Sequence, residues 1–214
     1  MTELNASIRD ITTPRRMRRL PVSPRGFPVP WFVAWLGGVP DFRCIGLGKL
    51  VKAIHQRCCW LCGEPLGVWQ TYAIGPMCIV NRVTSEPPSH LDCAEYAARA
   101  CLFLTKPGMR RNEKDLPEER NVAGVMIPRN PGVVALWITR SSKPFNVSNG
   151  VLFDLGEPER ILWYCEGRTA TRAEVEASVA SGLPLLEAGA NKGGPDAIKE
   201  LSQCIARAQA LLPA

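Results

Sequence analysis

Four residues of this 214-residue chain have the types and the spacing of a metal site. Cys59 and Cys62 form a Cys-x-x-Cys pair followed by Gly63, and His90 and Cys93 form a His-x-x-Cys pair. A structural Zn²⁺ ion takes four soft or borderline ligands in a tetrahedron, and three sulfurs with one imidazole meet that need. We therefore predict that the chain folds around one structural Zn²⁺ ion held by these four residues.

Two other cysteines compete for a ligand position. Cys58 could take the place of Cys59, although the glycine that follows Cys62 favours Cys59, because Gly lets the backbone fold back under the metal. Cys78 could replace His90 if its segment approaches the ion. The alternative without a metal is a set of buried cysteines beside a helix-capping histidine.

The same residues could serve catalysis only together with other side chains that act as a base. If His90 only caps its helix, three ligands leave an open position for water, and Glu86 or Asp92 could act as the base of a catalytic zinc site. A cysteine nucleophile would need a nearby base, and His55 stands three residues before Cys58. The sequence shows neither an oxyanion loop nor an acidic partner for that pair, so we expect no catalysis from it.

The ligands must be positioned by a turn, a strand pair and a helix. The stretches 68–74 and 77–83 surround Gly75-Pro76, which predicts paired strands. Ser89 and Asp92 have the spacing of a capping box, so Ser89 would be the N-cap and His90 the first residue of a helix that runs to about residue 103. The positive end of that helix favours thiolate over thiol. This order of elements is that of a treble clef, and we predict a treble-clef-like unit in an α+β fold.

Apolar periodicity and turn signals predict the other elements. They are a β-hairpin around Gly37-Gly38, a short helix over 48–56, strands over 133–139, 151–154 and 161–166, a helix from the Thr171–Glu174 capping box to about 182–184, and a last helix from Pro195. An antiparallel meander is the simplest arrangement of the three strands, beside the zinc unit.

Changes in composition divide the chain into four segments. They are a basic flexible arm over 1–27, the zinc-binding region over 28–107, a charged linker or loop over 108–128, and a strand meander with helices over 129–214. The two larger regions either share one core or form two.

Composition limits the class of protein. An apolar fraction of 46% with six Trp predicts a packed globule and excludes a disordered tail protein. Nine Cys is an odd count, so a fully paired disulfide framework is excluded. We find no signal peptide and no apolar run long enough to span a bilayer, so we expect a soluble intracellular protein with no membrane partner. The cysteines outside the zinc site are predicted to be small core residues: Cys44, Cys101, Cys165 and Cys204.

Basic residues gather in two places, within a net charge of +6. The arm carries Arg15, Arg16, Arg18 and Arg19, and the later loop carries Arg110 and Arg111. Such clusters favour phosphate-rich or acidic partners, and the alternative is that both are solvated surface. Exposed aromatic residues such as Trp31, Trp60 or Trp69 would instead favour a protein partner, unless they pack in the core.

Several longer motifs resemble those of a group of uncharacterised small bacteriophage and prophage proteins. They are Arg25-Gly26-Phe27-Pro28-Val29-Pro30-Trp31-Phe32-Val33-Ala34-Trp35, Cys59-Trp60-Leu61-Cys62-Gly63-Glu64-Pro65-Leu66-Gly67, Ile74-Gly75-Pro76-Met77-Cys78, Glu86-Pro87-Pro88-Ser89-His90 and Glu166-Gly167-Arg168. The resemblance implies a phage origin, and hence the cytoplasm of a bacterial host, and it supports the metal site. The group brings no assigned activity, so the resemblance implies no substrate.

These observations predict a non-enzymatic, zinc-stabilised phage accessory protein that binds nucleic acid or a host or viral protein, with no small-molecule substrate. The alternative enzyme is an HNH-like treble-clef nuclease, which places a general-base histidine after the knuckle. The chain has two histidines, the stretch 72–83 contains none, and Asn81 alone cannot activate water, so such a nuclease would need atypical catalytic residues. A purely structural, virion-associated role is the third possibility.

Overall fold

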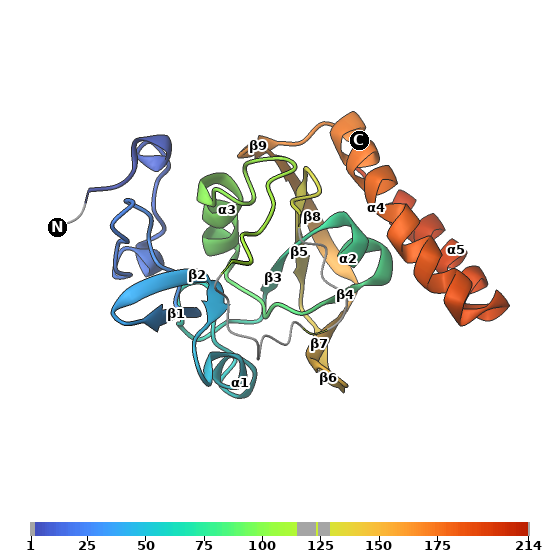
Figure 1. The fold of residues 1–214 in the computed structure, drawn as a ribbon, viewed down its shortest axis with the longest axis horizontal. Helices are drawn as coiled ribbons and strands as arrows, with labels where there is room; N and C mark the ends of the chain where they lie inside the picture. The colour runs from blue at the N-terminus through green and yellow to red at the C-terminus, as the bar shows by residue number, and fades with distance from the viewer. Residues whose placement is uncertain (1–2, 115–122, 124–128, 214) are drawn as a thin grey trace.

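The computed structural model describes residues 3–114, 123 and 129–213. After two short 3₁₀ turns at Ala6–Ile8 and Arg15–Met17, the elements run in the order shown in Figure 1. They are β1 (Val33–Leu36), β2 (Val39–Ile45), α1 (Lys49–His55), β3 (Gln70–Ile74), α2 (Pro76–Asn81), β4 (Val83–Thr84), α3 (Leu91–Ala100), β5 (Val134–Thr139), β6 (Ser142–Val147), β7 (Gly150–Leu155), β8 (Pro158–Cys165), β9 (Arg168–Thr169), α4 (Arg172–Gly193) and α5 (Pro195–Gln209). The predicted α+β class is confirmed.

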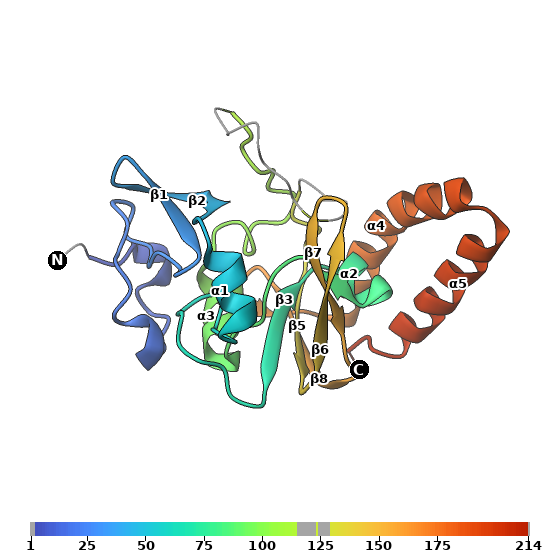
Figure 2. The same ribbon diagram turned by 90° about the horizontal axis from the view of Figure 1, so that it is seen from below.

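The central sheet has the strand order β3-β5-β8-β9 and is antiparallel. All six residues of β5 are buried, because both faces of the sheet are covered. Val134 and Leu136 pack against Ala94 and Ala98 of α3. The alternate residues of β5, with Trp137 at their centre, join α2, α4 and α5 in the main core. Figure 2 shows α3 on one side of β3 and β5, and α2 with the two long helices on the other.

The predicted meander is wrong in its arrangement. β5 and β8 pair with each other, and the β6–β7 hairpin between them joins β4 in a second sheet of order β4-β7-β6. The predicted strand 151–154 is therefore β7 of this second sheet. β6 was not predicted because half of its six residues are polar and most are exposed, so it lacks a clear apolar alternation.

The predicted strand over 77–83 is wrong, because this segment forms the helix α2. Gly75 is the N-cap and Pro76 occupies the first turn, where its fixed φ and missing N–H suit a helix. Arg82 then ends the helix in the left-handed conformation, with φ of 55°. The hairpin expected between the two ligand pairs is consequently not formed, and β3 pairs with β5 instead. The treble-clef arrangement is thus not confirmed.

The helix α4 begins at the predicted capping box. The Thr171 hydroxyl accepts a hydrogen bond from the Glu174 N–H at 3.3 Å, and the Glu174 carboxylate accepts one from the Thr171 N–H at 2.8 Å. The predicted stop near 182–184 is wrong, since the helix continues through Pro184 to Gly193. A proline inside a helix costs about 3 kcal/mol. The packing of α4 against α2 and α5 offsets that cost.

We expect Thr171→Ala to lower the free energy of unfolding by about 1 kcal/mol, because the first turn of α4 loses its side-chain acceptor. Chemical denaturation measures the change. Thr171→Ser keeps the hydroxyl and should be close to the wild type. Equal stability of Thr171→Ala and Thr171→Ser would contradict a role for the cap.

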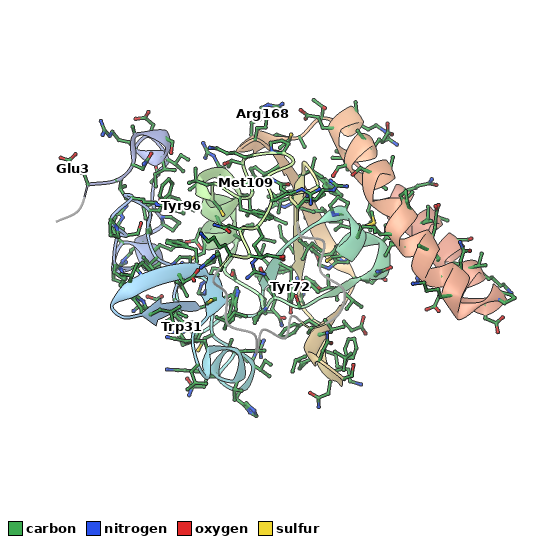
Figure 3. The ribbon with its side chains drawn as sticks, viewed as in Figure 1. Glu3, Trp31, Tyr72, Tyr96, Met109 and Arg168 are labelled. Carbon is green, nitrogen blue, oxygen red and sulfur yellow. The ribbon has the colours of Figure 1, made fainter. Side chains whose placement is uncertain are left out.

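The N-terminal segment, expected as a flexible arm, is folded against the protein. Ile8 and Met17 are buried and pack in one cluster with Tyr96 of α3 and with the predicted ligands. Tyr96 lies between α3 and this segment (Figure 3). The loop closes on itself through the Asn5 N–H, which donates to the carbonyl of Gly26 at 2.9 Å. This segment, whose regular elements are two short 3₁₀ turns, is held in place by the buried side chains of Ile8 and Met17.

The main core contains residues from both sides of the predicted linker, including Tyr72 and Ile74 of β3 and Trp163 of β8. Most of that linker, 115–122 and 124–128, lies outside the described residues.

Within the part of the chain that the structure describes, no helix has the length and apolar character to cross a membrane.

Candidate metal centre

The four predicted ligands meet at one point and are placed to hold a metal ion. Cys59, Cys62 and Cys93 are buried, His90 is half-buried, and their ligand atoms all lie within 4.8 Å of one another. Sulfurs bound to a single tetrahedral Zn²⁺ are separated by about 3.8 Å, since each Zn–S bond is about 2.3 Å long. The cluster therefore has the size of a single-ion site.

The first ligand pair lies on a tight turn that the backbone closes on both sides. The Gly63 N–H donates to the Cys59 carbonyl at 2.9 Å, and the Cys59 N–H donates to the Glu64 carbonyl at 2.8 Å. Gly63 has φ of 76°, a conformation that favours glycine. The Cys62 N–H lies 3.4 Å from the Cys59 sulfur and can stabilise its thiolate. The turn thus orients two sulfurs toward one side.

The second ligand pair lies at the start of α3, but the helix begins one residue later than predicted. His90 is the N-cap, without a side-chain capping bond, and the helix covers Leu91–Ala100. The predicted N-cap Ser89 instead pairs with Thr71 through two backbone hydrogen bonds, so the capping box does not form. Asp92 accepts from the Cys93 N–H at 3.0 Å. The backbone pairing with β3 thus prevails over the local capping signal.

The imidazole of His90 is oriented for metal binding by its second nitrogen. Its Nε2 lies 3.1 Å from the Pro65 carbonyl oxygen, and its Nδ1 lies 3.4 Å from the Cys62 sulfur. A carbonyl only accepts hydrogen bonds, so Nε2 carries a hydrogen and Nδ1 is the nitrogen that faces the sulfurs. Loss of the proton from Nδ1 would give the tautomer that a metal ligand requires.

The cluster concentrates negative charge that protons or a cation must balance. Hydrogen bonds from Cys62, Cys93 and His90 hold the pKa of the Cys59 thiol far below its usual range. The neighbouring sulfurs of Cys59 and Cys62 raise the pKa of His90 to about 10. Hydrogen bonding to the same two sulfurs, with burial, raises the pKa of Cys93. A divalent cation could replace these shared protons.

Metal retention should therefore fall as the pH falls, because the ligands bind as thiolates and neutral imidazole and must be deprotonated. Protons compete for all four ligand atoms in acid, so we expect slow release near neutral pH and faster release below it. A chromophoric zinc indicator measures the release. A release rate that does not change between neutral and acidic pH would contradict ligation by these groups.

The two rival cysteines lie outside the ligand group. Cys58 forms an isolated bridge with Pro65, and its thiol lies 3.8 Å from the Gln56 carbonyl oxygen. Cys78 belongs to α2, where burial raises the pKa of its thiol to about 11. The first cysteine of the ligand group is therefore Cys59 and not Cys58.

Of the four cysteines predicted to be small core residues, two are buried. Cys165 and Cys204 are buried as predicted, whereas Cys44 is half-buried and Cys101 is exposed. Cys101 is the C-cap residue that follows α3.

Two arginines that were predicted to contact a partner form ion pairs with acids beside the ligand cluster. Arg16 lies 3.2 Å from Asp92 and 3.5 Å from Glu64. Arg19 lies 3.2 Å from Glu64 and donates to the Cys62 carbonyl at 3.2 Å. Sequence reasoning missed this network, although one acid directly follows the Cys62-Gly63 turn and another stands between the two later ligands. Two sequence features could have predicted this network: acids next to the ligands, and a separate arginine-rich segment that could pair with them.

The other predicted partner residues lie in two separate places. Arg15 and Arg18 are exposed on the N-terminal segment, and Arg18 donates to the Thr13 carbonyl at 3.3 Å. Arg110 is exposed and forms a backbone bridge with Arg129. The Arg111 guanidinium donates to the Arg43 carbonyl.

The aromatic residues near the knuckle attach the β1–β2 hairpin to it. Trp60 is only 3% exposed, so of the two possibilities for this residue the structure supports core packing. Its ring stacks on Phe32 with centroids 4.7 Å apart. The Trp31 N–H donates to the Leu61 carbonyl at 2.8 Å, and its ring lies 4.2 Å from the Lys49 ammonium. Trp69 is exposed, with the Arg140 guanidinium 4.4 Å from its ring.

Comparison with known protein families, curated proteins and solved structures gives no match for this chain.

Proposed function

We propose that the ion is Zn²⁺ and that its role is structural. The observation that carries this proposal is the closed donor set, in which three sulfurs and one imidazole nitrogen lie within 4.8 Å of one another. Four protein ligands complete a tetrahedron and leave no position for substrate or activated water. Thiolate-rich sites also favour Zn²⁺ over Mg²⁺ and Ca²⁺, which prefer oxygen.

The ion would join four parts of the chain. Cys59 and Cys62 bring the knuckle turn, and His90 and Cys93 bring the start of α3. The N-terminal segment docks on the same cluster through Met17 and the arginine network. The base of β1–β2 docks on the knuckle through aromatic contacts. In this proposal the unit is a treble-clef-like variant, in which a strand and a helix stand in place of the hairpin.

The proposed function is that of a non-enzymatic, zinc-stabilised binding protein of phage origin, which acts in the host cytoplasm on nucleic acid or on a host or viral protein. The support for an anionic partner is the surface charge at the N-terminal end of the molecule. Arg9, Arg15, Arg18 and Arg25 are exposed there. Arg16 and Arg19 also form ion pairs with acids beside the metal site, so in this proposal the partner is met mainly by the other four arginines.

Neither histidine of the chain is placed where an HNH-like nuclease would need its general base. His90 faces the sulfurs, and His55, the other histidine of the chain, lies exposed at the end of α1 before the knuckle. A catalytic zinc site would need His90 to leave the ion. Its Nδ1 lies within reach of the Cys62 sulfur, which argues for ligation.

Cobalt substitution tests the structural site. Co²⁺ added to metal-free protein should give the intense visible bands of a tetrahedral sulfur-rich site at one ion per chain, together with thiolate charge-transfer absorption. Cys93→Ser, refolded from denaturant in the presence of Co²⁺, should show a weaker charge-transfer band, whereas Cys58→Ser treated in the same way should show an unchanged one. Spectra of octahedral Co²⁺, or equal loss in both variants, would overturn the proposal.

The charged partner surface has its own test. Fluorescence anisotropy with a duplex oligonucleotide would follow binding of Arg15→Gln/Arg18→Gln over a range of salt concentrations. The slope of log K against log salt should become shallower by about 0.9 for each phosphate that the variant no longer neutralises. Lys192→Gln/Lys199→Gln at the far end of α4 and α5 is the control. An unchanged slope in the arginine variant would mean that these residues are solvated surface only.

A further inference from the structure

The β1–β2 hairpin and the chain that follows it expose an unusual amount of apolar surface. Seven of the thirteen large apolar side chains that are exposed in the described residues lie between positions 35 and 51. Their exposed fractions are 49% for Trp35, 51% for Leu36, 60% for Val39, 46% for Phe42, 53% for Ile45, 103% for Leu47 and 60% for Val51. We call these seven residues the hairpin patch. Exposed large apolar side chains gathered in one short segment are typical of a site that interacts with protein or membrane.

Among the described residues, the tip of the β1–β2 hairpin has open space around it. Its tip is the two-residue turn Gly37-Gly38, both with positive φ, and a Cβ added at either glycine would meet nothing within 4 Å. Trp35 and Leu36 are successive strand residues, so they point to opposite faces of the ribbon. Val39 pairs with Leu36 and shares its face. Both faces are therefore apolar and exposed, and a flat protein surface would cover only one of them.

The charge around the hairpin patch is positive. Between residues 33 and 57 the chain has four basic residues, Arg43, Lys49, Lys52 and Arg57, and one acid, Asp41, which gives 4 − 1 = +3. Asp41 is itself paired with Arg43 at 2.8 Å. A second copy of the chain would bring like charges together on this surface, which is unfavourable. An anionic partner complements it.

The composition of the hairpin patch distinguishes between anionic partners. Single-stranded nucleic acid is bound by aromatic stacking and cations, and five of the seven residues are aliphatic and can do neither. A lipid bilayer takes Trp and Phe at its interface, aliphatic side chains below it, and lysines at the anionic headgroups. It also surrounds an inserted ribbon on both faces.

We infer that the hairpin patch docks the protein peripherally on the surface of an anionic lipid bilayer. Lys49 and Lys52, which lie 4.2 Å and 5.9 Å from the Trp31 ring, stand on α1 beside the patch and meet the headgroups. Figure 3 shows Trp31 beside α1 at the base of the hairpin. This inference goes beyond the proposed function. The absence of a spanning segment, on which the expectation of no membrane partner rested, does not bear on peripheral docking.

Vesicle sedimentation of the full chain tests the inference. The metal-bound protein should sediment with phosphatidylcholine vesicles that contain about 30 mol% phosphatidylserine and much less with phosphatidylcholine alone. Trp35→Ser/Leu36→Ser/Val39→Ser should weaken partitioning at least about tenfold, because three apolar side chains no longer insert. Lys52→Gln should weaken it about fivefold. Leu185→Ser/Ile198→Ser, which alters exposed apolar residues of α4 and α5, should bind like the wild type.

Three results would overturn the inference. The first is no sedimentation of folded protein with phosphatidylserine vesicles. The second is equal sedimentation of the triple serine variant and the wild type. The third is a dimer in light scattering that the triple serine variant converts to a monomer, because the hairpin patch would then be an interface between copies. Failure of the zinc proposal is distinct, since it appears in the cobalt spectra and not in the vesicle assay.

Discussion

Removal of the metal with a strong chelator is expected to unfold at least residues 58–104. A structural zinc site contributes on the order of 10 kcal/mol to folding, which is as large as the whole net stability of a typical domain. In metal-free protein the three buried cysteines would take up protons, and the bonds that join the knuckle to α3 would be lost. Hydrogen exchange before and after chelation should show loss of protection in the knuckle and in α3.

The N-terminal segment should lose its protection in the same step, because Ile8 and Met17 pack on the ligand cluster. Replacement of the ligands has a related expected outcome: Cys59→Ala, Cys62→Ala and Cys93→Ala should each give insoluble protein. Cys58→Ala is the matched control, since this neighbouring cysteine is equally buried but lies outside the ligand group. An unchanged thermal melt after complete metal removal would refute the structural role.

Gly63→Ala is expected to destabilise the protein by about 2–4 kcal/mol. A Cβ at this position would lie 2.5 Å from two ring atoms of Trp31, and φ of 76° strains any residue with a side chain. The ring has little room to move away, because the Trp31 backbone N–H is bound to the Leu61 carbonyl and the Lys49 ammonium lies 4.2 Å from the ring centre. The substitution should therefore loosen both the knuckle and the base of the hairpin.

Gly67→Ala provides the control for that change, since Gly67 lies in the same loop and a Cβ there would meet nothing within 4 Å. Chemical denaturation of the zinc-loaded proteins compares the two variants. If both lose the same small amount of stability, the close approach of Gly63 and Trp31 contributes nothing to the fold.

The ligand set was predictable from the sequence because metal chemistry restricts residue type and spacing strongly. Cys-x-x-Cys-Gly and His-x-x-Cys place two donors each on a short stretch of backbone, whatever connects them. The β1–β2 hairpin was predictable for a similar reason, since Gly37-Gly38 supplies the two positive φ values that a two-residue turn requires. Thr171 and Glu174 likewise set the start of α4 through local hydrogen bonds.

Elements whose structure depends on contacts between residues far apart in the sequence were not predictable. The segment 76–81 is apolar, and a short apolar run fits a strand or a buried helix equally well. The N-terminal segment looked like an arm because its composition is basic and rich in proline, and its two apolar anchors are too far apart to form a periodic pattern. Ser89 had a good local partner in Asp92, but the backbone of Thr71 prevailed.

The arginine network shows the same limit for the site. Arg16 and Arg19 are separated from Glu64 and Asp92 by more than forty residues, so their pairing depends on the fold. Exposed pairs of this kind contribute about 0–1 kcal/mol each. Their effect is to hold the N-terminal segment beside a negatively charged ligand cluster.

The most direct test of the central claim is zinc K-edge X-ray absorption on protein purified without chelators or added metal. We expect one zinc per chain, with three sulfur neighbours at about 2.3 Å and one nitrogen at about 2.0–2.1 Å. Protein without stoichiometric zinc, or zinc with a shell of oxygen neighbours, would contradict the account.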